Sequence, residues 1–326
     1  MIRQSIWRLL VWGLALACAG AAVAAHGGRA SDWLDVLTHF APFWLAGGLA
    51  AIVAAFGVTP GWPRQIPIVL GAIAVVAAAG LMAPEYLRPI RPDVPAGGQH
   101  QIKIIQFNAK GDQRPREVAA RWIVDQQPDL IVMEEVTPQI RDAVLALHRY
   151  HVAPDPVTCP ECRVVIMSRK APVDTGLRDE WLSRWIAPMA RMTFAEADGG
   201  FTIMGAHETW PYPPGRQQAG FRQLAEMLDH FPKDRLILTG DFNSTPWSFA
   251  LQRADKRFGM ERRDRALFSW PAGPLTVWLI SPPFAFLPID HVYAGSAWRT
   301  VKIERGPRGL GSDHLPLVTT LALQPR

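Results

Sequence analysis

Acidic, amide and imidazole side chains recur in this 326-residue sequence at the ends of short apolar segments typical of β-strands. The set comprises Asn108, Glu134, Glu135, His207, Asp241, Asn243, Asp290, His291, Asp313 and His314. Carboxylate and amide oxygens suit a hard divalent cation, and imidazoles move protons near neutral pH. Singly, each residue has an ordinary structural explanation as a turn residue, a helix cap or a hydrogen-bonded core group. Their shared position after strands indicates one cleft, because α/β sheets hold binding and catalytic groups there.

The segments between these residues alternate between strand-like and helix-like patterns. Unbroken apolar runs predict strands at residues 102–107, 130–133, 163–168, 190–194, 201–206, 235–239, 289–293, 300–303 and 315–321. Residues 117–127 are helix-like, and Phe221, Leu224, Ala225 and Leu228 recur at the spacing of an amphipathic helix packed on a sheet. The alternation predicts an α/β fold.

The order of these motifs resembles the endonuclease/exonuclease/phosphatase (DNase I-like) superfamily. The resemblance rests on Gln106-Phe107-Asn108, PDLIVMEEV at 128–136, His207, GDFNSTP at 240–246, IDHVYA at 289–294 and GSDHLPL at 311–317. This superfamily contains DNase I-like nucleases, apurinic endonucleases, inositol-polyphosphate phosphatases and neutral sphingomyelinases. The resemblance implies a four-layer α/β sandwich, in which helices flank two packed sheets, and a Mg²⁺- or Mn²⁺-dependent phosphoester hydrolase.

The resemblance also implies which residues hold the metal. Glu135 takes the place of the metal anchor, and Asn108 and Asp313 would complete the metal site directly or through water. The family signature has Gln-Glu at this point of the chain, so Glu134 is a departure from it.

Five further residues receive catalytic roles from the same resemblance. Asp241 and Asn243 would orient and activate the attacking water, and His207 would hydrogen-bond the phosphoryl oxygens. His314 would act beside the scissile phosphate, with Asp290 holding its ring in one tautomer. Either His314 or Asp241 takes the proton of the water.

The first 100 residues carry only six basic and four acidic residues, far fewer than the rest of the chain. Residues 9–28, 36–63 and 65–84 contain no Asp, Glu, Lys or Arg, and each segment is close to the roughly 20 residues that a membrane-spanning helix needs. We therefore predict three transmembrane helices at 1–86, a Pro/Gly-rich linker at 87–99 and an endonuclease/exonuclease/phosphatase domain at 100–326. A cleaved signal peptide is the alternative for the first segment.

The charges that flank the first segment favour one orientation. Arg3 and Arg8 precede it, whereas Asp32 and Asp35 accompany Arg29 in the loop that follows. This predicts an inside N-terminus and a multi-pass protein of the cell membrane, the inner membrane in a Gram-negative bacterium, with its catalytic domain outside the cytoplasm. In that compartment the CPEC motif at 159–162 could close a small disulfide, or it could hold two idle thiols.

The charge of the soluble part bears on the substrate. Of the chain's net charge of +5, only +3 lies beyond residue 100, which is little for a nucleic-acid groove. Nucleic acids and phospholipid headgroups both remain as substrates, the lipid bilayer is a partner, and no obligate protein partner is indicated. The alternative function is a catalytically inactive, membrane-tethered module that binds a phosphate ligand.

Overall fold

The computed structural model describes residues 2–90, 94, 100–110, 116–160, 162–178, 188–196, 199–273 and 283–324. Contacts divide the chain into two compact units. The N-terminal unit comprises residues 1–88 with 212–215 and 245–253, and the C-terminal unit comprises residues 89–211, 216–244 and 254–326. The two short segments that join the N-terminal unit are not contiguous with it in sequence.

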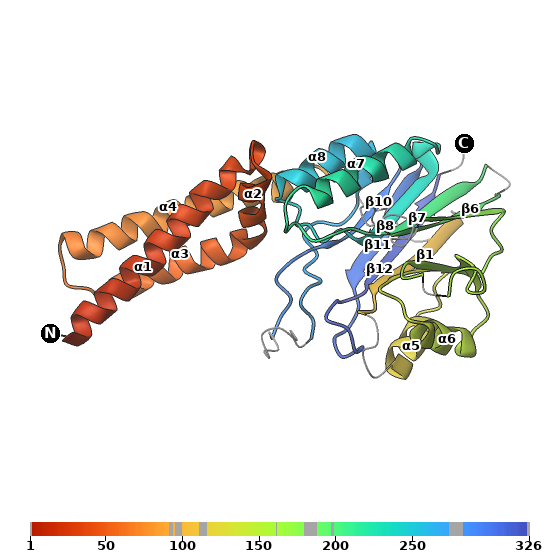
Figure 1. Cartoon of the computed structure of the whole chain (residues 1–326), viewed down its shortest axis with the longest axis horizontal. Helices are drawn as coiled ribbons and strands as arrows, with labels where there is room; N and C mark the ends of the chain where they lie inside the picture. Colours follow the sequence, from red (N-terminus) through yellow and green to blue (C-terminus); the bar gives the residue numbers. More distant parts are fainter. Residues whose placement is uncertain are drawn as a thin grey trace. The chain divides into compact units, whose positions relative to one another are not determined.

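Three long helices build the N-terminal unit, α1 (Ile2–Ala25), α3 (Ala41–Ala55) and α4 (Trp62–Leu87), drawn in red to orange in Figure 1. They contact one another through small residues, and a methyl group added at Gly48 of α3 would lie 2.8 Å from the Gly71 carbonyl of α4. Residues 3–29, 32–55 and 62–87 form three helical segments that are long and apolar enough to span a membrane.

The second apolar segment is not one continuous helix. It opens with α2 (Asp32–Asp35) and the 3₁₀ turn η2 (Val36–Phe40), which follow the 3₁₀ turn η1 (His26–Arg29), and α3 starts only at Ala41. Within the same unit, the buried Asp35 carboxylate accepts the N–H groups of Phe249 and Ala250 at 2.8 Å each. Phe249 and Ala250 begin helix α8 (Phe249–Phe258). The backbone N–H groups of a helix's first turn have no partner within the helix, so a carboxylate there is favourable.

The C-terminal unit contains two six-stranded mixed sheets. Sheet A has the order β11-β12-β1-β2-β4-β3, and its strands are Trp298–Arg305, Leu317–Leu323, His100–Asn108, Leu130–Glu134, Val165–Ser168 and His151–Ala153. Sheet B has the order β5-β6-β7-β8-β10-β9, and its strands are Asp174–Arg178, Met189–Phe194, Phe201–His207, Leu236–Asp241, Asp290–Ala294 and Glu261–Arg262. Helices α5 (Arg116–Asp125), α6 (Pro138–Leu147) and α7 (Arg216–Leu228) and the 3₁₀ turn η4 (Lys233–Arg235) complete the unit.

Alternate residues of the strands fill two different layers. On β1, Ile104 points into the core between the sheets together with Ile203 and Ile237 of sheet B. Its neighbour Ile105 points to the outer face of sheet A, where it packs with Ile123 of α5 and other apolar residues of α5 and α6. In Figure 1, α5 and α6 flank one side of the sheets, and α7 flanks the other. The four-layer α/β sandwich implied by the resemblance is confirmed.

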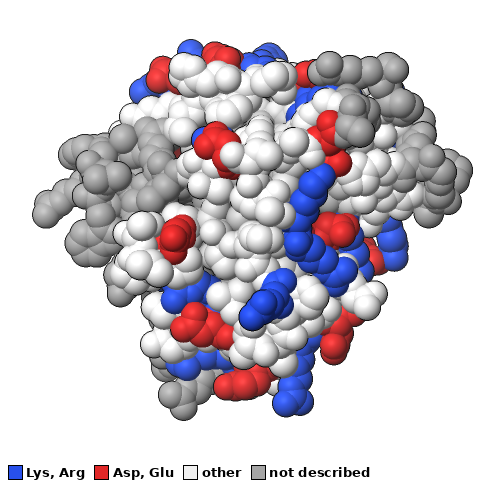
Figure 2. Space-filling view, turned by 90° about the vertical axis from the view of Figure 1, so that its right-hand side faces the viewer, with Lys and Arg blue, Asp and Glu red and all other residues white. Residues whose placement is uncertain are grey.

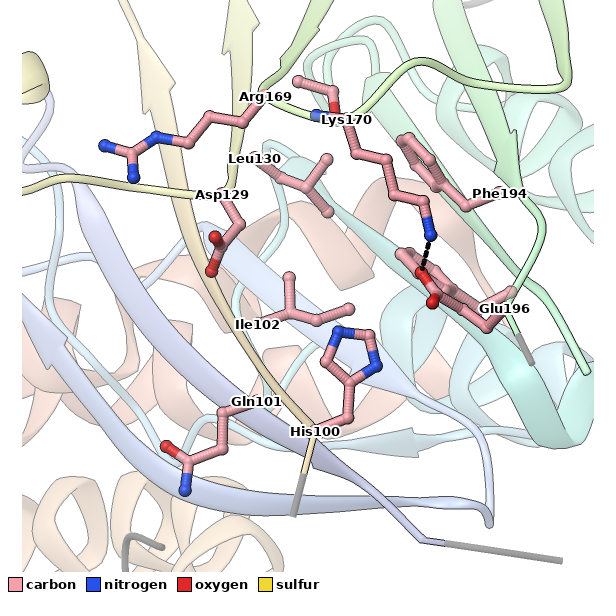
Figure 3. A pocket seen from close by; sticks show the side chains of 11 residues that line it. His100, Gln101, Ile102, Asp129, Leu130, Arg169, Lys170, Phe194 and Glu196 are labelled. Carbon is pink, nitrogen blue, oxygen red and sulfur yellow. Dashed lines mark hydrogen bonds and ion pairs between the residues drawn. The ribbon is translucent and has the colours of Figure 1, made fainter. Parts of the chain in front are cut away.

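A cavity of about 150 Å³ opens where β1 and β2 begin. Figure 3 shows His100, Asp129, Lys170 and Glu196 among its lining side chains, with the Lys170 ammonium 2.7 Å from the Glu196 carboxylate. These residues lie at the start of the strands, whereas the polar residues singled out in the sequence follow the other end of β1 and β2.

Cys159 and Cys162 form a disulfide between β3 and β4, with 5.4 Å between their Cα atoms. Cys18 of α1 is a buried free thiol. The disulfide is one of the two states that the CPEC motif left open.

Gly240 permits the close approach of β7 and β8 directly before the first candidate catalytic carboxylate. Its φ is +155°, and a Cβ at this position would overlap the Ala206 carbonyl oxygen. We expect Gly240→Ala to lower the free energy of unfolding by roughly 2–5 kcal/mol, because it combines overpacking with an unfavourable backbone angle. Thermal unfolding of the full chain in detergent, followed by tryptophan fluorescence, measures the effect. The matched control is Gly309→Ala, since Gly309 also has a positive φ (+84°) but open space at its Cβ position; equal losses in the two variants would contradict the packing argument.

Candidate active site

Strand register brings three of the predicted catalytic residues side by side on sheet B. β7 and β8 are parallel with His207 opposite Asp241, and β8 and β10 are antiparallel with Asp241 opposite Asp290. Residues paired across neighbouring strands lie about 5 Å apart at their Cα atoms. Register alone therefore puts an imidazole and two carboxyl groups at one edge of this sheet.

Sheet A contributes the metal-site candidates from the same ends of β1 and β2. These two strands are parallel, and Asn108 pairs with Glu134. Immediately after the strands, Lys110, Glu135 and Asn243 adopt positive φ values of 50°, 50° and 47°. Non-glycine residues rarely do so, and such strained residues cluster at functional sites. The turns that follow β1, β2 and β8 thus share an unusual backbone conformation.

Two amide side chains of β1 connect the sheets. The Asn108 amide nitrogen donates to Glu135 Oε1 at 3.1 Å and to Asp241 Oδ2 at 2.9 Å. The Gln106 amide nitrogen donates to Glu134 Oε2 at 2.9 Å and to Asp290 Oδ1 at 2.8 Å. Each amide therefore hydrogen-bonds one carboxyl group from the end of β2 (Glu134 or Glu135) and one carboxyl group of sheet B (Asp290 or Asp241).

His314 lies between two of these carboxylates. Its Nδ1 is 2.9 Å from Asp290 Oδ2, and its Nε2 is 3.6 Å from Asp241 Oδ2. Burial lowers the pKa of His314, but the carboxylates of Asp290 and Asp241 and the hydrogen bond to Asp290 outweigh it and raise the pKa to about 10. Asp290 is affected in the opposite direction, since the charge of His314 and their hydrogen bond outweigh burial and lower its pKa.

Two other buried carboxyl groups, those of Asp241 and Glu134, are harder to ionise. Burial raises the pKa of Asp241, and the charge of Asp290 adds to this, although His314 opposes it. Burial and the Asp290 charge raise the pKa of Glu134 well above its usual range. Since the environment separates these pKa values, the carboxyl groups can take different roles in proton transfer.

His207 and Asn243 complete the set on sheet B. His207 Nε2 lies 3.7 Å from Asp241 Oδ2, 3.8 Å from Glu135 Oε1 and 3.3 Å from the Asn243 amide nitrogen. The Asn243 backbone N–H donates to Asp241 Oδ1 at 2.8 Å. Asp241 therefore has a fixed orientation, and both of its oxygens face groups of the site.

Asp313 has two partners that the sequence did not indicate. Its Oδ2 accepts a hydrogen bond from the Lys110 ammonium at 2.6 Å and another from Trp270 Nε1 at 3.0 Å. Gln106 is a third contributor whose role was missed, although it belongs to the first motif. The positive φ of Lys110 and the packing of Trp270 are features of three-dimensional structure, so spacing in the sequence could not have found them.

His291, the histidine beside Asp290, belongs to a different environment. It is buried, with Nδ1 2.8 Å from Asp264 and Nε2 2.9 Å from the Ser244 carbonyl. Burial raises the pKa of Asp264, but the charge of His291 and the hydrogen bond between the two residues outweigh it and lower this pKa to about 2. His291 thus helps to hold the segment that follows Asn243.

The donor set fits a divalent cation. Side-chain atoms of Asp241, Asp290 and His314 lie within 4.8 Å of one another, but Asp290 holds the imidazole protonated, so the carboxylates and not His314 are the available ligands. Glu135 Oε1 and Asp241 Oδ2 accept from the same Asn108 nitrogen, so two carboxylates also converge there. Clusters of carboxylates are the ligands that Mg²⁺ and Mn²⁺ prefer.

The sequence profile described as Endonuclease/Exonuclease/phosphatase family matches residues 105–314, which include every residue of this site. The chain belongs to the endonuclease/exonuclease/phosphatase family. This is a family of phosphoester hydrolases, and it generally uses divalent metals. No curated protein matches the chain.

Solved structures of the endonuclease/exonuclease/phosphatase family share the fold. One from Bacteroides vulgatus is 15% identical, with a TM-score of 0.57 over 69% of this chain and 100% of its own. TDP2 from D. rerio, complexed with a single-stranded DNA product, is 14% identical, with a TM-score of 0.53 over 68% of this chain and 98% of its own. Sphingomyelinase C from Streptomyces griseocarneus is 16% identical, with a TM-score of 0.50 over 68% and 99%. At these identities the similarity shows the fold and leaves the substrate open.

The charge state of His314 can be measured in the metal-free protein. With a pKa of about 10, its imidazole should stay protonated from pH 6 to 8.5 in EDTA, whereas a free histidine titrates near 6.5. We expect Asp290→Asn to bring the titration of His314 down into this pH range, because the variant removes the main charge that raises the pKa. Nitrogen chemical shifts of ¹⁵N-histidine-labelled protein, assigned with a His314→Gln variant, report the titration. Asp142→Asn on the exposed face of α6 is the control, and a His314 that titrates near 6.5 in the unmodified chain would contradict the prediction.

Proposed function

We propose that this protein is a membrane-anchored, Mg²⁺- or Mn²⁺-dependent phosphoester hydrolase. One observation carries the proposal, the convergence of Asp241, Asp290 and His314 within 4.8 Å in a chain of the endonuclease/exonuclease/phosphatase family. A buried cluster of two carboxyl groups and an imidazole costs free energy unless its members pair, and such arrangements are typical of catalytic sites.

Glu135 is the residue that we propose as the anchor of the metal. Its side chain is 31% exposed, more than the 1% of Asp241, so its carboxylate can be reached from solvent. Asn108 would act through water, because its amide nitrogen and not its oxygen faces the carboxylates of Glu135 and Asp241. A bound divalent cation supplies a Lewis acid that neutralises charge on the phosphoryl oxygens.

We assign the proton transfers to two pairs of residues. Asp241, whose pKa is raised by burial, would accept the proton of the attacking water, with Asn243 fixing its orientation. His314, kept protonated by Asp290, would stabilise the charge that develops on the phosphoryl group. His207 faces the same space from β7 and would hydrogen-bond a phosphoryl oxygen.

The substrates that we propose are phosphoesters outside the cytoplasm, either nucleic acid or phospholipid headgroups. The structural neighbours include a protein bound to a DNA product and a sphingomyelinase. On the face of the molecule in Figure 2, Lys and Arg side chains form a narrow band with Asp and Glu beside it, and uncharged residues surround them. Among the described residues of this face, basic and acidic side chains are therefore mixed.

Hydrolysis of bis(p-nitrophenyl) phosphate by the full chain in detergent tests the activity. We expect turnover with Mg²⁺ or Mn²⁺ and none with EDTA. His314→Ala and Asp241→Ala should each lower kcat by about 10²–10⁴-fold, because acid-base groups and charge-stabilising groups typically contribute this much. The thermal unfolding midpoint of both variants should stay close to that of the unmodified chain, which shows that each variant is folded.

Glu135→Gln separates metal binding from chemistry in the same assay. It should raise the Mg²⁺ concentration required for half-maximal activity, while excess metal restores part of the rate.

Near-normal activity of His314→Ala and Asp241→Ala would contradict the assignment of a hydrolase. A chain without metal-dependent turnover would instead favour a module that only binds a phosphate ligand.

Fusion of alkaline phosphatase after residue 98 tests the proposed location of the catalytic domain. This reporter folds only in an oxidising compartment, so an outward domain should give an active fusion. A green fluorescent protein fusion at the same point is the control for a cytoplasmic location. Fluorescence together with inactive phosphatase would overturn the topology and restore intracellular nucleic acids as substrates.

A further inference from the structure

Lys110 lies inside the site although no sequence motif pointed to it. It follows Asn108 by two residues at the end of β1, and its backbone N–H donates to the Asn108 side-chain oxygen at 2.8 Å. It shares a positive φ with Glu135 and Asn243, two residues of the proposed catalytic set. Its ammonium group is 2.6 Å from Asp313 Oδ2.

The Lys110–Asp313 pair is itself held in place. Trp270 Nε1 donates to the same Asp313 oxygen at 3.0 Å, and the Trp210 ring packs edge-on against Trp270 with 5.8 Å between centroids. The Asp313 carboxylate therefore has a fixed orientation and two donors on one oxygen. A metal ion at Oδ2 would compete with these two hydrogen bonds, so only the other oxygen of Asp313, Oδ1, could bind a metal without disturbing the pair.

The ammonium group has capacity left for a ligand. It offers three N–H donors, and Asp313 takes one of them. The Lys110 side chain is 22% exposed, whereas that of Asp313 is 9% exposed, so the cation lies at the open edge of the pair.

The charges of the site call for such a cation. Asp290 pairs with His314, and Glu135 and Asp241 both face His207. One divalent ion at Glu135 would leave the anionic phosphoester next to several carboxylates. A lysine in the site offsets that repulsion without a second metal ion.

We propose that Lys110 is a substrate-binding residue whose ammonium group, positioned by Asp313, holds a non-bridging phosphoryl oxygen. Asp313 then acts as a positioning residue for Lys110, in place of the metal ligand that the resemblance implied. The inference deepens the proposed function and rests on it for the identity of the substrate. It gives the site one metal ion and one lysine.

The test compares Lys110→Met and Lys110→Arg in the full chain in detergent. Lys110→Met should raise KM for bis(p-nitrophenyl) phosphate by about 10- to 100-fold, the loss expected for a charge-assisted hydrogen bond, with Mn²⁺ affinity within about threefold of the unmodified chain. Lys110→Arg keeps the charge and donors and should recover most of this loss. Lys170→Met is the matched control, because Lys170 forms a similar 2.7 Å ion pair with Glu196 at the opposite end of the strands.

A second readout separates failure of this inference from failure of the proposed function. Calorimetric binding of inorganic phosphate should weaken by at least about tenfold in Lys110→Met even if the chain hydrolyses nothing. Unchanged KM and unchanged phosphate binding would overturn the role of Lys110. A large loss of Mn²⁺ affinity in Lys110→Met would also overturn it, because it would place the lysine in the support of the metal site.

Discussion

Two amide side chains on one strand hold the site together. Gln106 and Asn108 lie two residues apart on β1, so both point to the same side, and each donates to one carboxyl group from the β2 end and one from sheet B. The four carboxyl groups would repel one another if all were ionised. Buried amide donors are a neutral means of holding them in one geometry, because each hydrogen bond stabilises the carboxylate without adding a competing charge.

This constraint explains the electrostatics of the neighbouring groups. Asp290 is fixed by Gln106 and paired with His314, so it remains ionised and keeps the imidazole protonated. Glu134 shares the same Gln106 nitrogen, and burial together with the charge of Asp290 raises its pKa. The departure of Glu134 from the family signature thus adds a second buried carboxyl group to that of Asp290 on the same Gln106 amide, and burial makes it harder to ionise.

The N-terminal unit shows the same use of a buried carboxylate for a structural purpose. Asp35 accepts the first N–H groups of α8, and His39 Nδ1 lies 3.2 Å from the Thr245 backbone nitrogen. Thr245 belongs to the GDFNSTP motif, two residues after Asn243. Residues 245–253 therefore have their main contacts with the apolar helices rather than with the sandwich, which a division of the sequence at a linker does not anticipate.

The sequence by itself determined the fold class, the strands that carry the motifs and the family. Apolar runs such as Leu130–Glu134 and Leu236–Asp241 are unambiguous because both faces of these strands are buried. It did not predict the strands β3, β5 and β9, which contain only 3, 5 and 2 residues, or the ten-residue helices α6 and α8. Only tertiary structure decided that Lys110 and Trp270 meet Asp313 across separations of 203 and 43 residues. It also showed that the second apolar segment begins with a 3₁₀ turn, Val36–Phe40, before α3 starts. The reason is physical: strand periodicity is a local property of the chain, whereas the partners of a buried charge depend on which distant segments the sheets bring together.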